Sequence, residues 1–202
     1  MLRILSTLIL SLLPMLMMAQ YAWELEKDKD GIRVYSSEVK DSPFRATKVA
    51  CDLAGDYEKL TAVISDVDGM TDWVYKSSSC EVLQSYDSLD FLYCVITDMP
   101  WPMTDRESVI HLQFQTDSLP ESMTIIGTEA EEPVASGADL VRVSDYKATW
   151  KVTMPEKDLL SIEYILELDP GGGITPWMAN LMIEKGPYET FKGLSEKLKA
   201  LD

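Results

Sequence analysis

The sequence predicts an α+β domain in which a curved, largely antiparallel sheet is wrapped around one long C-terminal helix. Apolar and polar residues alternate with a period of two through the middle of the chain, as they do in strands with one wet face. Residues 176–199 instead carry an apolar stripe at helical spacing. With 202 residues, 46% of them hydrophobic, the chain is long enough for one well-packed domain, and nothing after residue 20 has the composition of a linker.

The first element is a targeting segment. Residues 1–19 have the form of a secretory signal peptide, with a positive charge at Arg3, a short apolar run and a small residue, Ala19, at the expected cleavage point. An uncleaved membrane anchor is the alternative, but it needs roughly 20 apolar residues to cross a bilayer, more than this run supplies. We therefore expect a mature domain of residues 20–202, exported to the periplasm or the cell exterior.

A hairpin opens the mature chain. Residues 23–29 are predicted to form a short helix, and the turn signal Asp30-Gly31 follows. Residues 32–35 and 45–53 alternate as two strands. Together they predict an N-terminal hairpin.

Two short helical pieces come next. Asp56 is a suitable N-cap for a helix that carries Leu60, Val63 and Ile64 at helical spacing. Residues 68–75 are predicted to continue as a second short helical piece. Beyond them the period changes from 3.6 to two.

The remaining strands alternate clearly enough to assign their faces. Their predicted ranges are 81–86, 91–96, 107–115, 123–128, 140–143, 147–154 and 160–168. One face collects the residues Ser108, Ile110, Leu112, Phe114, Ala148, Trp150, Val152, Met154, Leu160, Ile162, Tyr164, Leu166 and Leu168. The opposite face carries charged and polar residues, which predicts a sheet with one wet side.

The last helix has clear start signals. Pro170 to Gly173 end the final strand, Thr175 is a fitting N-cap, and Pro176 suits the first helical position. The pattern continues to about Lys199. Gly186-Pro187 falls inside it, and because proline removes a backbone donor we expect a kink or a break there.

Three cysteines allow at most one internal disulfide in an oxidising compartment. Cys80 and Cys94 flank the hairpin of residues 81–96, about three positions out of alignment, which is too far for a cross-strand bridge. Cys51 lies in an apolar strand pattern and is expected to be buried. The sequence contains no CxxC motif, and none of its stretches has all the ligands of a calcium-binding loop. We therefore expect no metal site and no cofactor.

The charge balance excludes one large class of partners. The 18 Lys and Arg stand against 34 Asp and Glu, giving a net charge of −16. Nucleic-acid binding needs a positive footprint, so we expect no nucleic-acid partner. The one histidine, His111, falls on the polar face of its strand, and no nucleophile motif is present. These features favour binding over catalysis.

A sheet of seven to nine strands is wider than the one helix predicted to cover it. Because a helix is about 10 Å across, the sheet must either curl tightly around it or leave space. Space lined by Trp, Tyr, Met, Ile and Leu would suit an apolar ligand. The alternative is that these residues simply pack against one another.

Three stretches resemble the StAR-related lipid transfer (START) family, in the family's order and over residues 22–200. They are Trp23-Glu24-Leu25 with 29–35, the Trp-Pro…Arg stretch of 98–107 with Glu107 where Asp is usual, and 169–177 before the last helix. The resemblance implies a helix-grip fold that encloses a tunnel for one lipid and carries out no chemistry. Counting six residues from Arg106 gives Leu112, where sterol-binding members often carry a buried Arg, so a sterol ligand is not implied.

The resulting prediction is an exported protein that holds one lipid or other apolar ligand and transfers it between membranes. The alternative is a cyclase or hydrolase of the same superfamily acting in the same cavity. The residues expected to contact the ligand are Trp73, Trp101, Ile110, Leu112, Phe114, Trp150, Ile162, Tyr164, Trp177, Met178, Leu181, Met182 and Tyr188.

Arg106 and the C-terminal helix are the predicted polar contacts. Arg106, between Asp105 and Glu107, is expected to form an ion pair near the strand start, with a lipid head group as its alternative partner. Residues 176–202 carry four Lys and four acidic residues, so this segment is the part least repelled by an anionic bilayer. We expect transient membrane contact there and a monomeric protein.

Overall fold

The computed structural model of the chain describes residues 21–130, 139–180 and 182–201. The predicted signal peptide and Leu181 lie outside these ranges. Within them, none of the helices has both the length and the apolar composition needed to cross a membrane.

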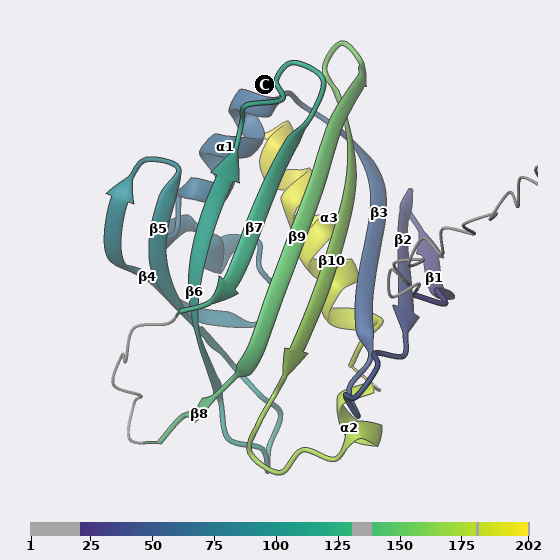
Figure 1. Ribbon diagram of the computed structural model, residues 1–202, viewed down its shortest axis with the longest axis vertical. Coiled ribbons are helices and arrows are strands. Elements are labelled where there is room, and N and C mark those ends of the chain that lie inside the picture. The colour runs from purple at the N-terminus through teal and green to yellow at the C-terminus, as the bar shows by residue number, and fades with distance from the viewer. Residues whose placement is uncertain (1–20, 131–138, 181, 202) are drawn as a thin grey trace, which may run out of the picture.

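One large curved sheet forms the body of the molecule (Figure 1). Its strands lie in the order β1-β2-β3-β10-β9-β7-β6-β5-β4, with β8 pairing to β6 beside this path. The strands are β1 Glu24–Lys29, β2 Ile32–Ser37, β3 Ala46–Ala54, β4 Ser77–Asp87, β5 Asp90–Thr97, β6 Arg106–Gln115, β7 Met123–Glu129, β8 Val141–Arg142, β9 Ser144–Glu156 and β10 Leu159–Asp169. All pairs are antiparallel except the short β6–β8 pair.

The predicted helix at residues 23–29 is wrong, because this segment is strand β1. Asp30 and Gly31 have φ values of 54° and 77°, the left-handed conformation that a two-residue hairpin turn requires. Lys29 therefore pairs directly with Ile32, and β1 runs antiparallel to β2. The turn signal joins β1 to β2, and the expected pairing of β2 with β3 is present as well.

The β4–β5 hairpin brings its cysteines closer in register than expected. Bulges after Val82 and Ser85 shift the pairing, so that Cys80 faces Val95 and Glu81 faces Cys94. The cysteines are thus one position apart instead of three, but adjacent positions point to opposite faces of a sheet. Cys51, Cys80 and Cys94 are all free and buried.

Two short helical segments close one end of the sheet, as the sequence predicts. Helix α1 spans Tyr57–Ser65, and the side chain of its N-cap Asp56 accepts a hydrogen bond of 2.8 Å from the Lys59 backbone N–H. A 3-10 helix, η1, spans Asp68–Asp72.

The C-terminal helix is broken, but one turn earlier than predicted. It consists of α2, Pro176–Asn180, and α3, Lys185–Lys199. Pro187 falls in the first turn of α3, where a missing backbone N–H costs little, so the chain has no need to bend at Gly186-Pro187. At the start of α2, Thr175 Oγ1 accepts a hydrogen bond of 3.4 Å from the Met178 backbone N–H, as expected of an N-cap.

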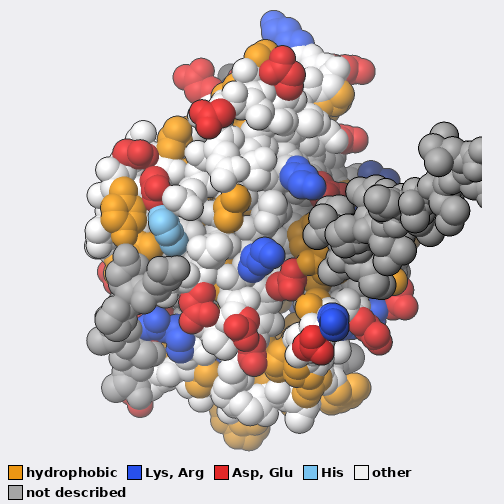
Figure 2. All heavy atoms as spheres, viewed as in Figure 1, with side chains coloured by type: hydrophobic (Ala, Val, Ile, Leu, Met, Phe, Trp, Pro, Cys, Tyr) orange, Lys and Arg blue, Asp and Glu red, His pale blue; other side chains and the backbone are white. Residues whose placement is uncertain are grey.

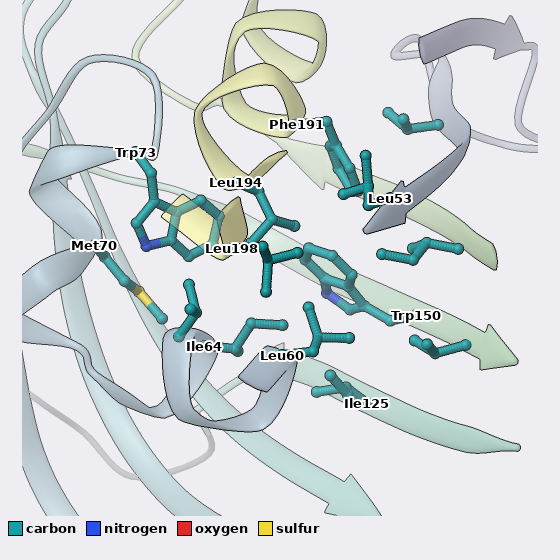
Figure 3. Packing of buried hydrophobic residues seen from close by; sticks show 14 of the residues in the cluster. Leu53, Leu60, Ile64, Met70, Trp73, Ile125, Trp150, Phe191, Leu194 and Leu198 are labelled. Carbon is teal, nitrogen blue, oxygen red and sulfur yellow. The ribbon is translucent and has the colours of Figure 1, made fainter. Parts of the chain in front are cut away.

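Helix α3 lies across the inner face of the sheet (Figure 1), and side chains of its C-terminal half pack in the hydrophobic core (Figure 3). Leu194 and Leu198 are 0% and 1% exposed and point toward Leu60 of α1. Gly193 permits close approach, since an added Cβ would lie 2.6 Å from the Trp73 carbonyl oxygen. The solid core therefore occupies the end of the sheet that α1 covers.

Candidate functional site

Two adjoining cavities lie between the sheet and the C-terminal segment, and the inner one reaches Ile64 of α1. The inner cavity has a volume of about 270 Å³ and the outer one about 240 Å³. Their walls share Thr97, Ser108, Leu166, Leu168 and Pro187. Each is slightly smaller than the roughly 300–1,000 Å³ of typical small-molecule pockets, and the adjoining pair falls within that range.

The cavities begin where α3 stops filling the sheet. Along the inner face of β10, Leu160 and Ile162 are 0% and 2% exposed, whereas Tyr164, Leu166 and Leu168 are only half-buried. The first two pack in the core, and the last three line the cavities. One strand thus passes from solid core to cavity wall at Tyr164.

Five predicted contact residues meet in the inner cavity: Trp73, Ile110, Leu112, Trp150 and Tyr164. Trp150 and Tyr164 are cross-strand partners whose ring centroids lie 4.7 Å apart. They belong to different strands of the sheet, while Trp73 follows η1 and approaches from beside α3. Sheet and helical layers therefore both contribute to this wall.

The outer cavity contains Met182 and Arg106 of the predicted residues. Its remaining walls come from the β5–β6 loop, the loop before α2, and α2 itself, which contribute Met99, Ile174 and Ala179 among others. Phe44 and Arg45, before β3, close the other side. The Arg45 side chain also pairs with Glu24 and Glu26 on β1.

The other predicted contact residues lie outside both cavities. Phe114 and Ile162 are buried in the solid core. Tyr188 faces the β1–β2 hairpin, where its hydroxyl donates a hydrogen bond of 2.5 Å to Asp30. Trp101 and Trp177 are 93% and 69% exposed. Met178 is half-buried on α2 and does not line either cavity.

Sequence reasoning missed several cavity residues. Tyr146 continues the alternation of Ala148 and Trp150 by one step, so extending the β9 pattern would have found it. Tyr93 lies on the inner face of β5, whose faces were not assigned. Phe191 falls in the helix predicted for residues 176–199, but only the packing shows that it reaches the cavity.

Arg106 does not form the expected ion pair with Glu107. Consecutive strand residues point to opposite faces, and Glu107 pairs on the outer side with Arg142, at 2.8 and 3.0 Å. The Arg106 guanidinium instead donates to the carbonyl oxygens of Pro170 at 3.2 Å, Gly171 at 3.3 Å, and Thr104. These bonds hold the loop before α2 and leave at most two of its five N–H donors for a head group.

The inner cavity is uncharged. Its described lining residues include no Lys, Arg, Asp, Glu or His. His111 lies on the outer face of the sheet, 2.5 Å from an Asp90 carboxylate oxygen. No group of three or more His, Cys, Asp or Glu in the described ranges is placed to hold a metal ion. The polar side-chain groups of the described lining are tyrosine, serine and threonine hydroxyls and the indole N–H groups of Trp73 and Trp150.

Comparison with known proteins identifies the family. No family model matches the chain. It is 31% identical over 173 residues to the uncharacterized protein PA1579 of Pseudomonas aeruginosa, covering 85% of this chain and 84% of that one. It also matches the crystal structure of a STAR-related lipid transfer protein from Xanthomonas axonopodis, with a TM-score of 0.80 and 25% identity over 88% of this chain and 98% of that one. The chain belongs to the StAR-related lipid transfer family.

More distant START structures share the fold. Human STARD10 has a TM-score of 0.76 at 15% identity, covering 88% of this chain and 73% of that one. Human StAR-related lipid transfer protein 5 has a TM-score of 0.79 at 12% identity, covering 89% and 87%. The predicted helix-grip fold is therefore confirmed: a curved, unclosed antiparallel sheet with a C-terminal helix across it. This START domain has a lipid-binding or lipid-transfer fold.

Proposed function

We propose that this START domain is an exported carrier that holds one lipid or other apolar ligand between the sheet and α3 and transfers it between membranes. The observation that carries the proposal is the pair of adjoining cavities beside a solid core. After cleavage of residues 1–19 the domain would act in the periplasm or outside the cell.

The cavities would lower the main energetic barrier to lipid transfer, which is the exposure of the acyl chains to water. Moving a lipid through water exposes its chains at about 0.8 kcal/mol per methylene, so a chain of roughly 16 carbons faces on the order of 12 kcal/mol. Trp150, Leu166 and Phe191 present apolar surface to such a chain. A carrier that encloses the chain removes most of this cost.

The C-terminal segment supplies the opening. Gly171, Gly172 and Gly173, before α2, all have φ values between 63° and 69°, and α2 ends at Asn180 before the chain turns into α3. Ala179 and Asn180 form part of the outer cavity wall. A rotation of α2 about these two joints would open the outer cavity without disturbing the core under α3.

Membrane contact is assigned to the same end of the molecule. Trp177 projects from α2 and Trp101 from the β5–β6 loop, and both elements line the outer cavity. Hydrophobic side chains gather at the lower end of the view in Figure 2, where Figure 1 places α2. Tryptophan favours the boundary between lipid and water, so this surface would dock the opening against a bilayer.

A catalytic role is not proposed. The cyclase or hydrolase alternative needs an acid, base or nucleophile inside the cavity. The inner cavity offers phenols and aliphatic hydroxyls with no described base beside them. Burial raises the pKa of Tyr146 to about 12, which leaves it protonated near neutral pH.

Native mass spectrometry of the protein purified from its own host tests the proposal. We expect the folded monomer to carry one lipid per chain, which collision in the gas phase releases and fragmentation identifies. The matched control is the Leu166→Trp variant, which fills the shared wall of both cavities. A wild-type protein that carries no lipid, and that also fails to take up a fluorescent lipid from vesicles, would contradict the proposed function.

A further inference from the structure

Three tyrosines from different strands line the inner cavity. Tyr93 comes from β5, Tyr146 from β9 and Tyr164 from β10. Burial raises the pKa of Tyr93 and of Tyr164 well above the usual value, and repulsion from a Tyr146 phenolate raises both further. The three phenols therefore stay protonated and uncharged near neutral pH.

A glycine on the neighbouring strand leaves space for one of these tyrosine rings. Gly127 on β7 lies beside the Tyr146 ring, and an added Cβ there would approach Tyr146 Cε1 to 3.3 Å. A larger residue at this position would press the Tyr146 ring out of place. The cluster is thus built into the packing of the sheet.

The protein does not satisfy every polar group around the cavities. In the described ranges, the buried side-chain atoms without a hydrogen-bond partner are Trp73 Nε1 and Arg45 Nε, and both residues line a cavity, Trp73 together with the three tyrosines. Tyr93 itself is only 7% exposed. Buried polar groups normally have partners, so an unpaired indole N–H on a cavity-lining residue indicates that a hydrogen-bond acceptor comes with the ligand.

The surroundings determine the charge of that partner. The described lining of the inner cavity holds no cation to pair with a carboxylate or phosphate and no anion to pair with an amine. Burying an unpaired charge is far more costly than burying a hydrogen-bonded hydroxyl or carbonyl. Phenols can donate to or accept from such uncharged groups.

We propose that Tyr93, Tyr146 and Tyr164 bind an uncharged hydroxyl or carbonyl group of the ligand, so that this carrier selects a lipid alcohol or ester over a lipid with an ionised group at its buried end. This inference rests on the proposed function. It adds that the inner cavity recognises a polar atom and is more than a container for hydrocarbon.

Displacement of the neutral dye N-phenyl-1-naphthylamine by three C12 probes tests this inference. The probes are dodecane, 1-dodecanol and dodecanoate, with dodecanoate fully ionised at pH 8. We expect the Tyr93→Phe/Tyr164→Phe double variant to bind 1-dodecanol about fivefold to tenfold more weakly than the wild type does, while its affinity for dodecane stays within about twofold. Wild-type protein should bind dodecanoate more weakly than 1-dodecanol.

The controls separate this inference from the proposed function. Tyr35→Phe, on β2 and outside both cavities, should leave all three affinities unchanged. The single variant Tyr93→Phe, checked by circular dichroism, gives a second reading should the double variant fold poorly. Unchanged 1-dodecanol binding in folded Phe variants would overturn the inference alone. If neither dodecane nor 1-dodecanol binds the wild type, the proposed function fails with it.

Discussion

The indole ring of Trp150 and the phenyl ring of Phe191 lie 5.0 Å apart between their centroids, and this contact divides the interior into two differently filled halves. Beyond it toward the C-terminus of α3, Leu194 and Leu198 are almost fully buried. On the other side Tyr164, whose ring lies 5.4 Å from that of Phe191, faces the inner cavity. The same sheet and helix therefore supply both stability and binding space.

The densely packed half of the interior, around Leu194 and Leu198, should contribute much of the stability. We expect Leu194→Ala to lower the free energy of unfolding by about 2–5 kcal/mol, because it deletes a fully buried side chain from tight packing. Urea denaturation followed by circular dichroism measures the change. Leu25→Ala, at a position 56% exposed on β1, is the control and should shift stability by no more than about 0.5 kcal/mol.

The half of the interior that contains the two cavities should tolerate a larger side chain. Leu166 is half-buried and lines both cavities, so Leu166→Trp should fill space and reduce lipid binding at least about tenfold with little change in melting temperature. Leu160→Trp is the matched control on the same strand face, where 0% exposure leaves no room, and it should destabilise by about 1–3 kcal/mol. Equal lipid binding by Leu166→Trp and wild type would place the ligand elsewhere.

Two glycines of α3 should respond to alanine in opposite directions. At Gly193 an added Cβ would lie 2.6 Å from the Trp73 carbonyl oxygen, so Gly193→Ala should cost about 1–3 kcal/mol. At Gly186 the nearest atom would be 3.9 Å away, so Gly186→Ala should be neutral or stabilising by up to about 1 kcal/mol. Thermal unfolding of both variants measures the difference. A stable Gly193→Ala protein would mean that α3 and the segment after η1 are less closely packed than described.

The fold was largely predictable from the sequence because most of its strands have one buried and one solvent-exposed face. Alternation in residues 107–115, 147–154 and 160–168 assigned the inner faces of β6, β9 and β10 correctly. The error at 23–29 has a local cause: a strand at the edge of the sheet is mostly exposed, so β1 has no apolar alternation to reveal it. Its partner β2 and the Asp30-Gly31 turn determine its structure.

The cavity walls were less predictable because core and cavity obey the same pattern. Ile162 and Tyr164 are both inward on β10, yet one packs in the core and the other lines the cavity. The difference depends on where α3 crosses the sheet, which no local pattern contains. Trp101 and Trp177 were predicted to line the cavity because they are large and apolar. They lie beyond the sheet and are exposed to solvent.

The three cysteines should be unreactive in the folded protein. Burial raises the pKa of Cys51 to about 12 and that of Cys94 to about 11, with the carboxylates of Asp52 and Glu107 adding to the shifts. At pH 8 only about one Cys51 in ten thousand is then the reactive thiolate. We expect Ellman's reagent to label no thiol within minutes in the native state and all three in guanidinium chloride. Rapid native labelling of Cys94 would show that the outer face near Glu107 opens.

The exposed tryptophans should drive membrane docking. Trp101→Ala and Trp177→Ala together should reduce binding to phosphatidylcholine vesicles at least about tenfold, because burial of a large aromatic side chain in the interface is worth about 1.5–3 kcal/mol. Vesicle co-sedimentation measures the bound fraction. Melting temperature should change little, since neither side chain lies in the core or lines a cavity.

The comparison with a second exposed aromatic gives this prediction its specificity. Tyr86 is 47% exposed on β4, at the opposite edge of the sheet from β1, and does not line the outer cavity. If docking depends on the end that carries the opening, Tyr86→Ala should bind vesicles as the wild type does. If it lowers docking as much as the tryptophan changes do, general surface hydrophobicity is responsible. In that case the two tryptophans lose their assigned role in docking.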